Sequence, residues 1–407
     1  MHVDTMRNID YWAGIPLCFI GSFISKTLNF FTHPTKPKNI LLIELSEMGS
    51  TILVDPAMQK LKRELNANLH FVIFAKNKPS LDLLRTVPEE NIFTIREHSL
   101  FALAGDTLSF LLWSRRKKID TVIDLELFSR FTALLSGLCG AVNRIGFHPF
   151  YNEGLYRGTM LTHKVAYNPH LHIAKNFIAL ANAVLSDTKE LPFSKSIISD
   201  EEILLRRVDV TESQKSTIAS KIAALCPAYA PETKRLVLLN ANASDLMPLR
   251  RWDKANYIEL SRRILTDYPD TVIALTGTPA EKEGLQAIPD ALKHERIVNL
   301  AGQTAFSELT ALYEISEFMV TNDSGPGHFS AVTSMPSFVL FGPETPKLYG
   351  SLGITTPIYA GLACSPCVAA TNHRKTPCDD NLCMQAISVE HVYKILKPSL
   401  ESSRFCR

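Results

Sequence analysis

The sequence predicts an α/β protein with two doubly wound parallel domains, preceded by an N-terminal apolar helix. A chain of 407 residues is longer than one ordinary hydrophobic core organises, so two cores are expected. In each half, short apolar runs alternate with helical patterns of about ten to fifteen residues, which is typical of parallel sheets. Apolar residues make up 46% and charged residues 21% of the chain, as in folded globular proteins.

Residues 1–38 are predicted to form a membrane-associated helix and a linker. The stretch from Tyr11 to Phe31 is mostly apolar, but Lys26 and several other polar residues interrupt it. Because a spanning helix needs about 20 predominantly apolar residues, we expect a peripheral or monotopic helix at the cytoplasmic face of the inner membrane. A helix packed against the protein's own surface remains the alternative.

The first predicted domain covers residues 39–190 and is followed by an inter-domain region at 191–234. Its apolar runs predict buried parallel strands, and the spacing of apolar residues between them predicts helices. The predicted strands are Ile40 to Leu45, Leu69 to Phe74, Asn91 to Ile95 and Ile119 to Asp124; the predicted helices include residues 58–65, 127–138 and 170–185.

The second predicted domain covers residues 235–407 and repeats the alternation, so two Rossmann-like domains are expected to face each other across a cleft. Its predicted strands are residues 235–240, 271–277, 318–323 and 336–342, and its predicted helices include 253–266 and 306–315. In such sheets ligands bind outside the carboxyl ends of the strands, so the loops there are the places to look for chemistry.

The most informative loop is TNDSGPGHFSA, residues 321–331, which follows a strand and enters a helix. Free backbone amides at the start of that helix suit a phosphate. Gly325 and Gly327 allow close backbone approach, Ser324 and His328 are potential donors, and Asp323 is placed to orient them. The alternative is an N-capped helix after a tight turn.

Two further loops follow strands of the second domain. In NANASDLMPLRRW, Asn242 and Ser244 precede Arg250 and Arg251, whose guanidinium groups suit a diphosphate. In LTGTPAEKE, Glu281 is placed to accept from ribose hydroxyls. The alternatives are a surface arginine pair and an acidic residue in the first turn of a helix.

The order of these segments resembles glycosyltransferase family nine, the lipopolysaccharide heptosyltransferase family. The resemblance runs from about Ile40 to about Val392. It includes the motifs LSEMGSTILVDPAM, RIGFHP, LLNANAS followed by RRW, LTGTPAE, LAGQT followed by EL, VTNDSGPGHFSA and LFGPETP.

This resemblance implies a GT-B fold and inverting transfer without a catalytic metal or other cofactor. The implied donor is a nucleotide-diphosphate sugar such as ADP-heptose, held mostly by the second domain, and the implied acceptor is a lipopolysaccharide core or other lipid-linked saccharide. At matching positions, Arg250 corresponds to a diphosphate ligand, Glu281 to a ribose contact, and residues 323–328 to the diphosphate cradle.

The chain departs from the family pattern in its first loop. Similar enzymes have Gly-Asp there and use the aspartate as general base, whereas this chain has Gly49 and Ser50. A serine cannot take the acceptor's proton unaided, so Glu47 in the same loop is the predicted substitute. Asp55 is placed further along, on the helix, and Glu44 within the strand. An end cap or a solvent-facing carboxylate remains the alternative for Glu47.

A competing interpretation is a catalytically inactive protein that binds a nucleotide sugar or glycolipid after losing the aspartate. An NAD-dependent oxidoreductase is disfavoured because the first loop lacks G-x-G-x-x-G. The balance of 43 basic and 41 acidic residues gives no argument for a nucleic-acid partner. Eight cysteines and the absence of a recognisable signal peptide favour a reducing, cytoplasmic compartment.

The C-terminal cysteines Cys364, Cys367, Cys378 and Cys383 begin with a C-x₂-C pair. Four thiolates at such spacing can hold a structural zinc ion, although the second spacing is looser than usual. Reduced free thiols are the alternative, and no catalytic metal is expected in either case.

Overall fold

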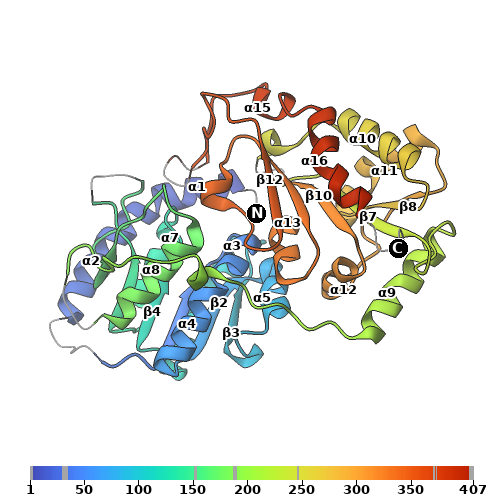
Figure 1. Cartoon of the computed structure of the whole chain (residues 1–407). Helices are drawn as coiled ribbons and strands as arrows, with labels where there is room; N and C mark the ends of the chain where they lie inside the picture. The colour runs from blue at the N-terminus through green and yellow to red at the C-terminus, as the bar shows by residue number, and fades with distance from the viewer. Residues whose placement is uncertain are drawn as a thin grey trace. The chain divides into compact units, whose positions relative to one another are not determined.

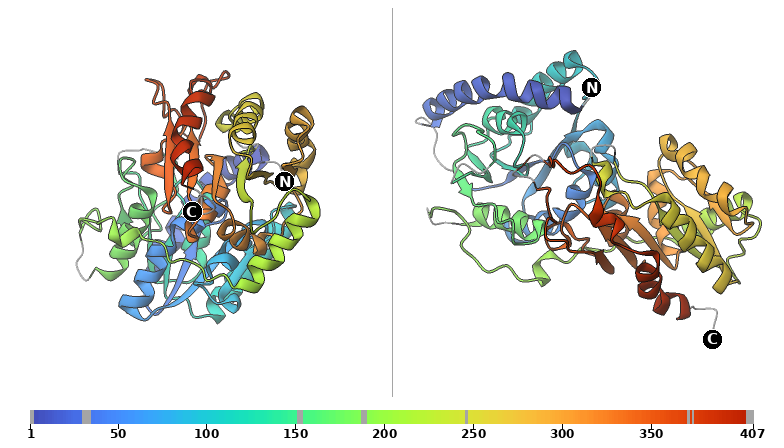
Figure 2. Two further views of the ribbon diagram at one scale, coloured as in Figure 1. Left: turned by 45° about the vertical axis from the view of Figure 1, so that its right-hand side comes forward. Right: turned by 90° about the horizontal axis from the view of Figure 1, so that it is seen from above.

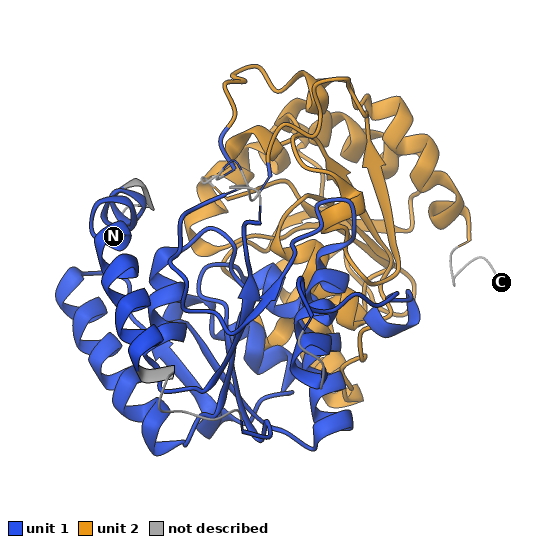
Figure 3. Cartoon of the chain, turned by 90° about the vertical axis from the view of Figure 1, so that its left-hand side faces the viewer, with its two compact units in different colours: residues 1–204, 369–375 blue, residues 205–368, 376–407 orange. Residues whose placement is uncertain are grey.

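A computed structural model describes residues 3–29, 35–150, 154–186, 190–244, 247–369, 372 and 374–402. Three predicted features extend outside these residues: the end of the apolar stretch at residues 30–31, part of the linker, and positions 245–246 of the arginine loop. The chain divides into two compact units, which Figure 3 distinguishes by colour. Unit 1 comprises Met1–Leu204 and Ala369–Lys375; unit 2 comprises Leu205–Val368 and Thr376–Arg407.

Unit 1 contains a six-stranded sheet in the order β3-β2-β1-β4-β5-β6, and all its neighbouring strands are parallel. The central strand β1 pairs with β2 on one side and β4 on the other, so Ile43 lies opposite both Val72 and Asp124. The strands are β1 (Asn39–Ile43), β2 (Asn68–Phe74), β3 (Ile92–Ile95), β4 (Thr121–Asp124), β5 (Asn143–Phe147) and β6 (His163–Val165).

Helices pack on the apolar strands of unit 1. Among these helices, α4 contacts α8 and α6 contacts α7. In one part of the core, Phe110 of α6 and Leu135 of α7 pack with Leu41 and Val122 of the sheet. The helices are α3 (Met48–Leu53), α4 (Asp55–Leu65), α5 (Pro79–Leu84), α6 (Leu100–Arg116), α7 (Arg130–Leu138) and α8 (Ile173–Leu185).

The N-terminal apolar stretch forms two helices, α1 (Val3–Trp12) and α2 (Gly14–Asn29), where a single helix was predicted. Helix α2 packs alongside α7 (Figure 1, Figure 2) and buries Cys18 completely. The Ser22 hydroxyl accepts a hydrogen bond from the backbone amide of Thr159 at 2.7 Å. One side of α2 therefore packs on the protein's own surface, the alternative that the sequence left open. No helix within the described ranges is long and apolar enough to cross a membrane.

Unit 2 contains a second parallel sheet of six strands, in the order β12-β11-β10-β7-β8-β9. Counted from its own first strand, this order is the same as in unit 1, which is the arrangement of doubly wound nucleotide-binding folds. The strands are β7 (Arg235–Asn240), β8 (Thr271–Leu275), β9 (Ile297–Asn299), β10 (Phe318–Asn322), β11 (Ser337–Phe341) and β12 (Thr355–Tyr359).

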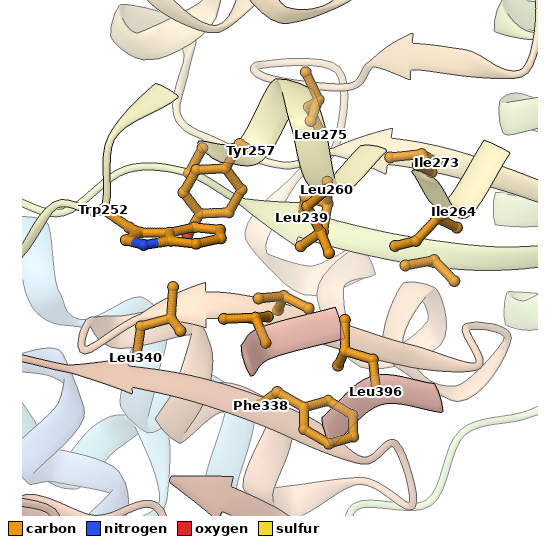
Figure 4. Packing of buried hydrophobic residues seen from close by; sticks show 14 of the residues in the cluster. Leu239, Trp252, Tyr257, Leu260, Ile264, Ile273, Leu275, Phe338, Leu340 and Leu396 are labelled. Carbon is orange, nitrogen blue, oxygen red and sulfur yellow. The ribbon is translucent and has the colours of Figure 1, made fainter. Parts of the chain in front are cut away.

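The core of unit 2 lies between this sheet and helices that include α10 and α16. Figure 4 shows Trp252, Tyr257, Leu260 and Ile264 packed with residues of the strands and with Leu396. The helices are α9 (Glu212–Leu225), α10 (Lys254–Asp267), α11 (Lys282–Leu292), α12 (Leu309–Glu314), α13 (Gly325–Phe329), α14 (Pro346–Tyr349), α15 (Leu382–Gln385) and α16 (Val389–Glu401).

Each sheet has one position where the strand order reverses, between β1 and β4 in unit 1 and between β7 and β10 in unit 2. Loops that leave the carboxyl ends of these strands diverge and leave room for a ligand. The loops containing Glu47 and Asp323 both begin at such positions. The topology therefore directs attention to the residues that the sequence singled out.

Candidate active site

The predicted phosphate loop of unit 2 begins where β10 ends. Asp323 is buried directly after the strand, and Ser324 caps helix α13 in an extended conformation with φ of −161°. At Gly325 a Cβ atom would lie 2.9 Å from two ring carbons of Phe329, so a side chain there needs the ring to move. Gly327 is buried within α13, and His328 is half-buried in its last turn. The glycines thus allow the tight entry into this short helix.

Arg250 links this loop to a third segment. It ends the turn η4 (Pro248–Arg250), and its Nη1 lies 3.7 Å from Oδ2 of Asp323 and 3.8 Å from Oε2 of Glu344. Glu344 is 3% exposed and follows β11 in the GPETP segment. Glu344 was not among the predicted site residues, although its position after a strand end marked it for attention. One guanidinium group therefore lies between two buried carboxylates.

The remaining residues of the arginine loop support its shape. Both Nε and Nη2 of Arg251 donate to the carbonyl oxygen of Ala243, at 2.9 and 2.6 Å. The Asn322 side chain donates to the carbonyl of Asn242 at 3.2 Å and accepts from the amide of Trp252 at 3.0 Å. Arg251 thus closes its own loop, and its predicted contact with a diphosphate stays a prediction.

Asn242 and Ser244 lie near the start of the same loop. The Nδ2 atom of Asn242 is buried without a hydrogen-bond partner among the described residues. The side chain of Ser244 is exposed. Binding roles for both residues stay predictions.

Glu281 forms a local cap in this structure. Its Oε2 accepts from the backbone amide of Thr278 at 2.6 Å and from the Thr278 hydroxyl at 2.9 Å. This is the capping-box pattern at the start of the turn η5 (Pro279–Glu281), which leads into α11. The contact to a ribose stays a prediction.

In unit 1, Glu47 and Ser50 lie together at the start of α3. Glu47 is the extended N-cap residue, with φ of −129°, and the Ser50 hydroxyl donates to its Oε2 at 3.0 Å. Gly49 lies in the first turn between them. The side chain of Arg374 contacts both carboxylate oxygens of Glu47, with Nη2 at 3.2 Å from Oε2. No sequence pattern indicated Arg374, because 327 residues separate the partners.

Two further carboxyl groups, those of Glu44 and Glu126, lie near Glu47. Glu44 and Glu126 are both almost completely buried. Burial raises the pKa of Glu44 well above its usual range, and the neighbouring Glu126 and Glu47 add to the rise. Burial also raises the pKa of Glu126 to about 7, although the backbone amide of Leu45 donates to it at 2.8 Å. These groups hold protons more strongly than exposed carboxyl groups do.

Asp124 completes this acidic group at the carboxyl end of β4. Its partner is the buried guanidinium of Arg157, which also donates to the hydroxyl of Thr132 at 3.0 Å. Burial raises the pKa of Asp124, while Arg157 opposes the rise. The end of the unit 1 sheet therefore carries four carboxyl groups and two guanidinium groups.

The structural zinc site that the cysteine spacing allows is not assembled within the described residues. Within the described residues, no group of three or more histidine, cysteine, aspartate or glutamate side chains is placed to hold a metal ion. Cys364 is exposed, whereas Cys383 is buried, and all four C-terminal cysteines are free thiols. The C-x₂-C spacing alone does not bring the second pair into a tetrahedral arrangement.

The sequence matches the family described as glycosyltransferase family 9 (heptosyltransferase) over residues 114–376. The chain belongs to this family. Lipopolysaccharide heptosyltransferase 2 of Salmonella typhimurium is 25% identical to the family 9 chain over 220 residues, which cover 53% of the chain and 58% of the relative. The family 9 chain thus spans little more than half of that relative. Lipopolysaccharide heptosyltransferase 1 of Campylobacter coli is 22% identical over 381 residues, covering 88% and 98%.

Solved structures of this family share the fold. The E. coli ADP-heptose lps heptosyltransferase II matches with a TM-score of 0.68 at 20% identity, covering 89% of this chain and 98% of that one. A glycosyl transferase family 9 structure from Veillonella parvula matches with a TM-score of 0.64 at 18% identity, covering 91% and 99%. Two parallel-sheet α/β domains of the GT-B kind, as predicted, are therefore confirmed.

Proposed function

We propose that this family 9 chain is an inverting glycosyltransferase. It transfers a heptose or related sugar from a nucleotide-diphosphate sugar to a lipopolysaccharide core or another lipid-linked saccharide. The observation that carries the proposal is the arrangement of Arg250, Asp323 and the start of α13 where the strand order of unit 2 reverses. The relatives named above are lipopolysaccharide heptosyltransferases, and E. coli heptosyltransferase WaaC has been solved with ADP.

Unit 2 supplies the donor-binding residues in this proposal. The guanidinium of Arg250 and the amides and side chains of residues 324–328 bind the diphosphate, and Glu281 accepts from the ribose. Asp323 orients Arg250, whose Nη1 lies 3.7 Å away. Negative charge develops on the departing diphosphate in the transition state. Residues that stabilise this charge therefore accelerate the reaction.

Unit 1 supplies the base. Glu47 takes the proton of the acceptor hydroxyl as its oxygen bonds to the anomeric carbon, while the bond from that carbon to the diphosphate oxygen breaks. The Ser50 hydroxyl, 3.0 Å from Oε2 of Glu47, helps to orient the carboxylate. No metal ion or other cofactor takes part in this scheme, so chelators are expected to leave the rate unchanged.

A membrane surface is the proposed location of the acceptor. Several aromatic side chains of the N-terminal helices point to solvent, including Trp12 at 77%, Phe19 at 69% and Phe23 at 73% exposure. Helix α6, which also packs on α7, exposes Phe101 and Leu108. Exposed apolar side chains of this kind favour peripheral attachment to a bilayer interface, here the cytoplasmic face of the inner membrane.

The second candidate function is a binding protein without transferase activity. The observation that favours it is the ion pair between Glu47 and Arg374, combined with serine at the position of the usual aspartate. An ion-paired carboxylate is a weaker base than an isolated one. This protein would bind the donor without transferring the sugar.

A transfer assay separates the two functions. Purified protein in detergent is incubated with ADP-heptose and a heptose-deficient lipopolysaccharide, with and without EDTA, and the lipid product is detected by mass spectrometry. We expect transfer by the wild type and a loss of about 10²-fold or more in kcat for Glu47→Gln, the usual effect of removing a general base. Ser50→Asp is the matched comparison. Transfer only after this substitution, or by no variant that still binds donor, would establish the binding protein instead.

A further inference from the structure

The segment Ala369–Lys375 packs with unit 1, although the residues on both sides of it belong to unit 2 (Figure 3). We call this segment the strap. Of this segment the structure describes residues 369, 372, 374 and 375. The backbone amide of Arg374 donates to the carbonyl of Ala369 at 3.0 Å, and the Asn372 side chain accepts from the amide of Ala369 at 3.0 Å. Arg374 has a left-handed backbone conformation with φ of 53°. Hydrogen bonding thus holds the backbone of Arg374 next to that of Ala369.

Arg374 makes a two-pronged contact with Glu47. Its Nη1 pairs with Oε1 and its Nη2 with Oε2, an arrangement that fixes the plane of the carboxylate as well as its position. The guanidinium carbon of Arg374 lies 6.0 Å from the centroid of the Phe128 ring. The two side chains are 23% and 25% exposed, so water screens this pair only partly.

Several carboxyl groups lie near Glu47. Glu44 precedes it on the segment that leaves β1, and Asp124 and Glu126 lie at the end of β4. Charge on Glu47 and on Glu126 raises the pKa of Glu44, while Arg374 lowers it, so these groups interact electrostatically. The second guanidinium, that of Arg157, is paired with Asp124. Arg374 therefore directly offsets the charge of Glu47.

We propose that Arg374 is a positioning residue, which keeps the Glu47 carboxylate ionised and oriented for the acceptor hydroxyl beside this acidic group. The inference rests on the proposed function of Glu47 as base. A base must be ionised before it accepts a proton, and a guanidinium paired with a carboxylate favours the ionised form. The strap thus brings to Glu47 a guanidinium group that lies 327 residues away in the sequence.

The direct test is the titration of Glu47 itself. Protein labelled with ¹³C at glutamate carboxyl carbons is followed by NMR from pH 3 to 9, and the Glu47 signal is assigned by its loss in Glu47→Gln. We expect Arg374→Met to raise the titration midpoint by about 1 to 3 pH units, the usual effect of a lost opposite charge. Arg374→Lys, which keeps the charge without the two-pronged geometry, should shift it less. Arg116→Met, at an exposed arginine of α6, is the matched control.

The same variants are compared in the transfer assay. With Arg374→Met, the acidic limb of the kcat profile should move to higher pH by the same amount, with the KM for donor unchanged and a partial rescue by Arg374→Lys. An unchanged Glu47 midpoint, or a profile that does not move in an active enzyme, overturns the inference. A shifted midpoint with no transfer by the wild type supports the electrostatic role of Arg374 and rejects the proposed function instead. If Arg374→Met does not fold, the comparison of wild type with Arg374→Lys decides.

Discussion

The two positions where strand order reverses have the same topology and opposite chemistry. In unit 1 the carboxyl ends of the strands gather carboxyl groups, three of them almost completely buried with raised pKa values: Glu44, Asp124 and Glu126. In unit 2 Nη1 of Arg250 lies 3.7 Å from Oδ2 of Asp323, the residue that precedes the N-cap of α13. In the proposed function, the same strand order thus positions the base in one unit and the diphosphate-binding residues in the other.

In both units the strand order determines where the candidate site lies, and the side chains determine its chemistry. In the proposed function, the carboxylate of Glu47 in unit 1 accepts a proton, whereas the guanidinium of Arg250 in unit 2 binds the diphosphate. Arg250 is itself flanked by Asp323 and Glu344, so its charge is partly offset before any ligand binds.

The largest expected effect comes from breaking the buried ion pair of unit 1. In Arg157→Met, Asp124 keeps its buried position and loses its guanidinium partner. Breaking a buried pair in this way costs about 3–5 kcal/mol of unfolding free energy. Urea unfolding followed by circular dichroism measures the loss. Arg96→Met, which removes an exposed pair with Asp106, is the control and should change little.

A recovery of stability in the double variant Asp124→Asn with Arg157→Met would support this explanation, because it removes the unpaired charge. If Arg157→Met is as stable as the control, the ion pair between Arg157 and Asp124 does not stabilise the carboxyl end of the unit 1 sheet. The contrast between the two units is then weaker.

A pH-dependent effect is expected from Glu126. Because its pKa is raised to about 7 in the folded protein, the folded state favours the protonated form. The stability from this proton is present below the unfolded pKa of about 4.5 and is lost as pH rises through about 7. Glu126→Gln should therefore gain stability relative to the wild type as pH rises from 5 to 8, as measured by urea unfolding at each pH. The control is Glu401→Gln, at an exposed residue of α16.

A flat difference between wild type and Glu126→Gln across this pH range would show that Glu126 carries no extra proton in the folded state. Glu126 would then be ionised in the folded protein, and the electrostatic surroundings of Glu47 and Arg374 would differ from those described above.

The smallest expected effect concerns the offset charge in unit 2. In Glu344→Gln, one of the two carboxylates beside Arg250 loses its charge while the size of the side chain is kept. ADP should bind roughly fivefold more tightly, equivalent to about 1 kcal/mol, since less negative charge opposes the diphosphate. Calorimetric titration measures this change. Weaker binding would instead give Glu344 a direct role in holding Arg250 in place.

Much of the architecture could be predicted from apolar runs, because buried parallel strands such as β1, β2, β7 and β8 are almost continuously hydrophobic. Four strands were not predicted: β5, β6, β9 and β12. They are short or contain polar residues, as in β5, where buried Arg144 donates to the carbonyls of Met160 and Ala141. The helix α9, which lies within the predicted inter-domain region, was not predicted either. Its apolar face is narrow, so the helical pattern in the sequence is weak.

The site was predictable to the extent that its residues follow strand ends. Glu47, Arg250 and Asp323 were singled out as candidates in this way, and Glu344 was accessible to the same rule. Arg374 was not, because only the folded chain brings the strap to Glu47. For Arg251 and Glu281, hydrogen bonds to their own loops decided the local role, and a sequence does not display such contacts.

The central claim, that unit 2 binds a nucleoside diphosphate beside Arg250, is tested most directly by calorimetric titration with ADP. Wild type is compared with Arg250→Met and with Arg262→Ala, an exposed arginine of α10 in the same unit. The account predicts saturable binding by wild type and the control, and a loss of about tenfold or more in affinity for Arg250→Met, because a charge-assisted contact is removed. Absence of saturable binding by the wild type, or equal affinity in Arg250→Met, would contradict it.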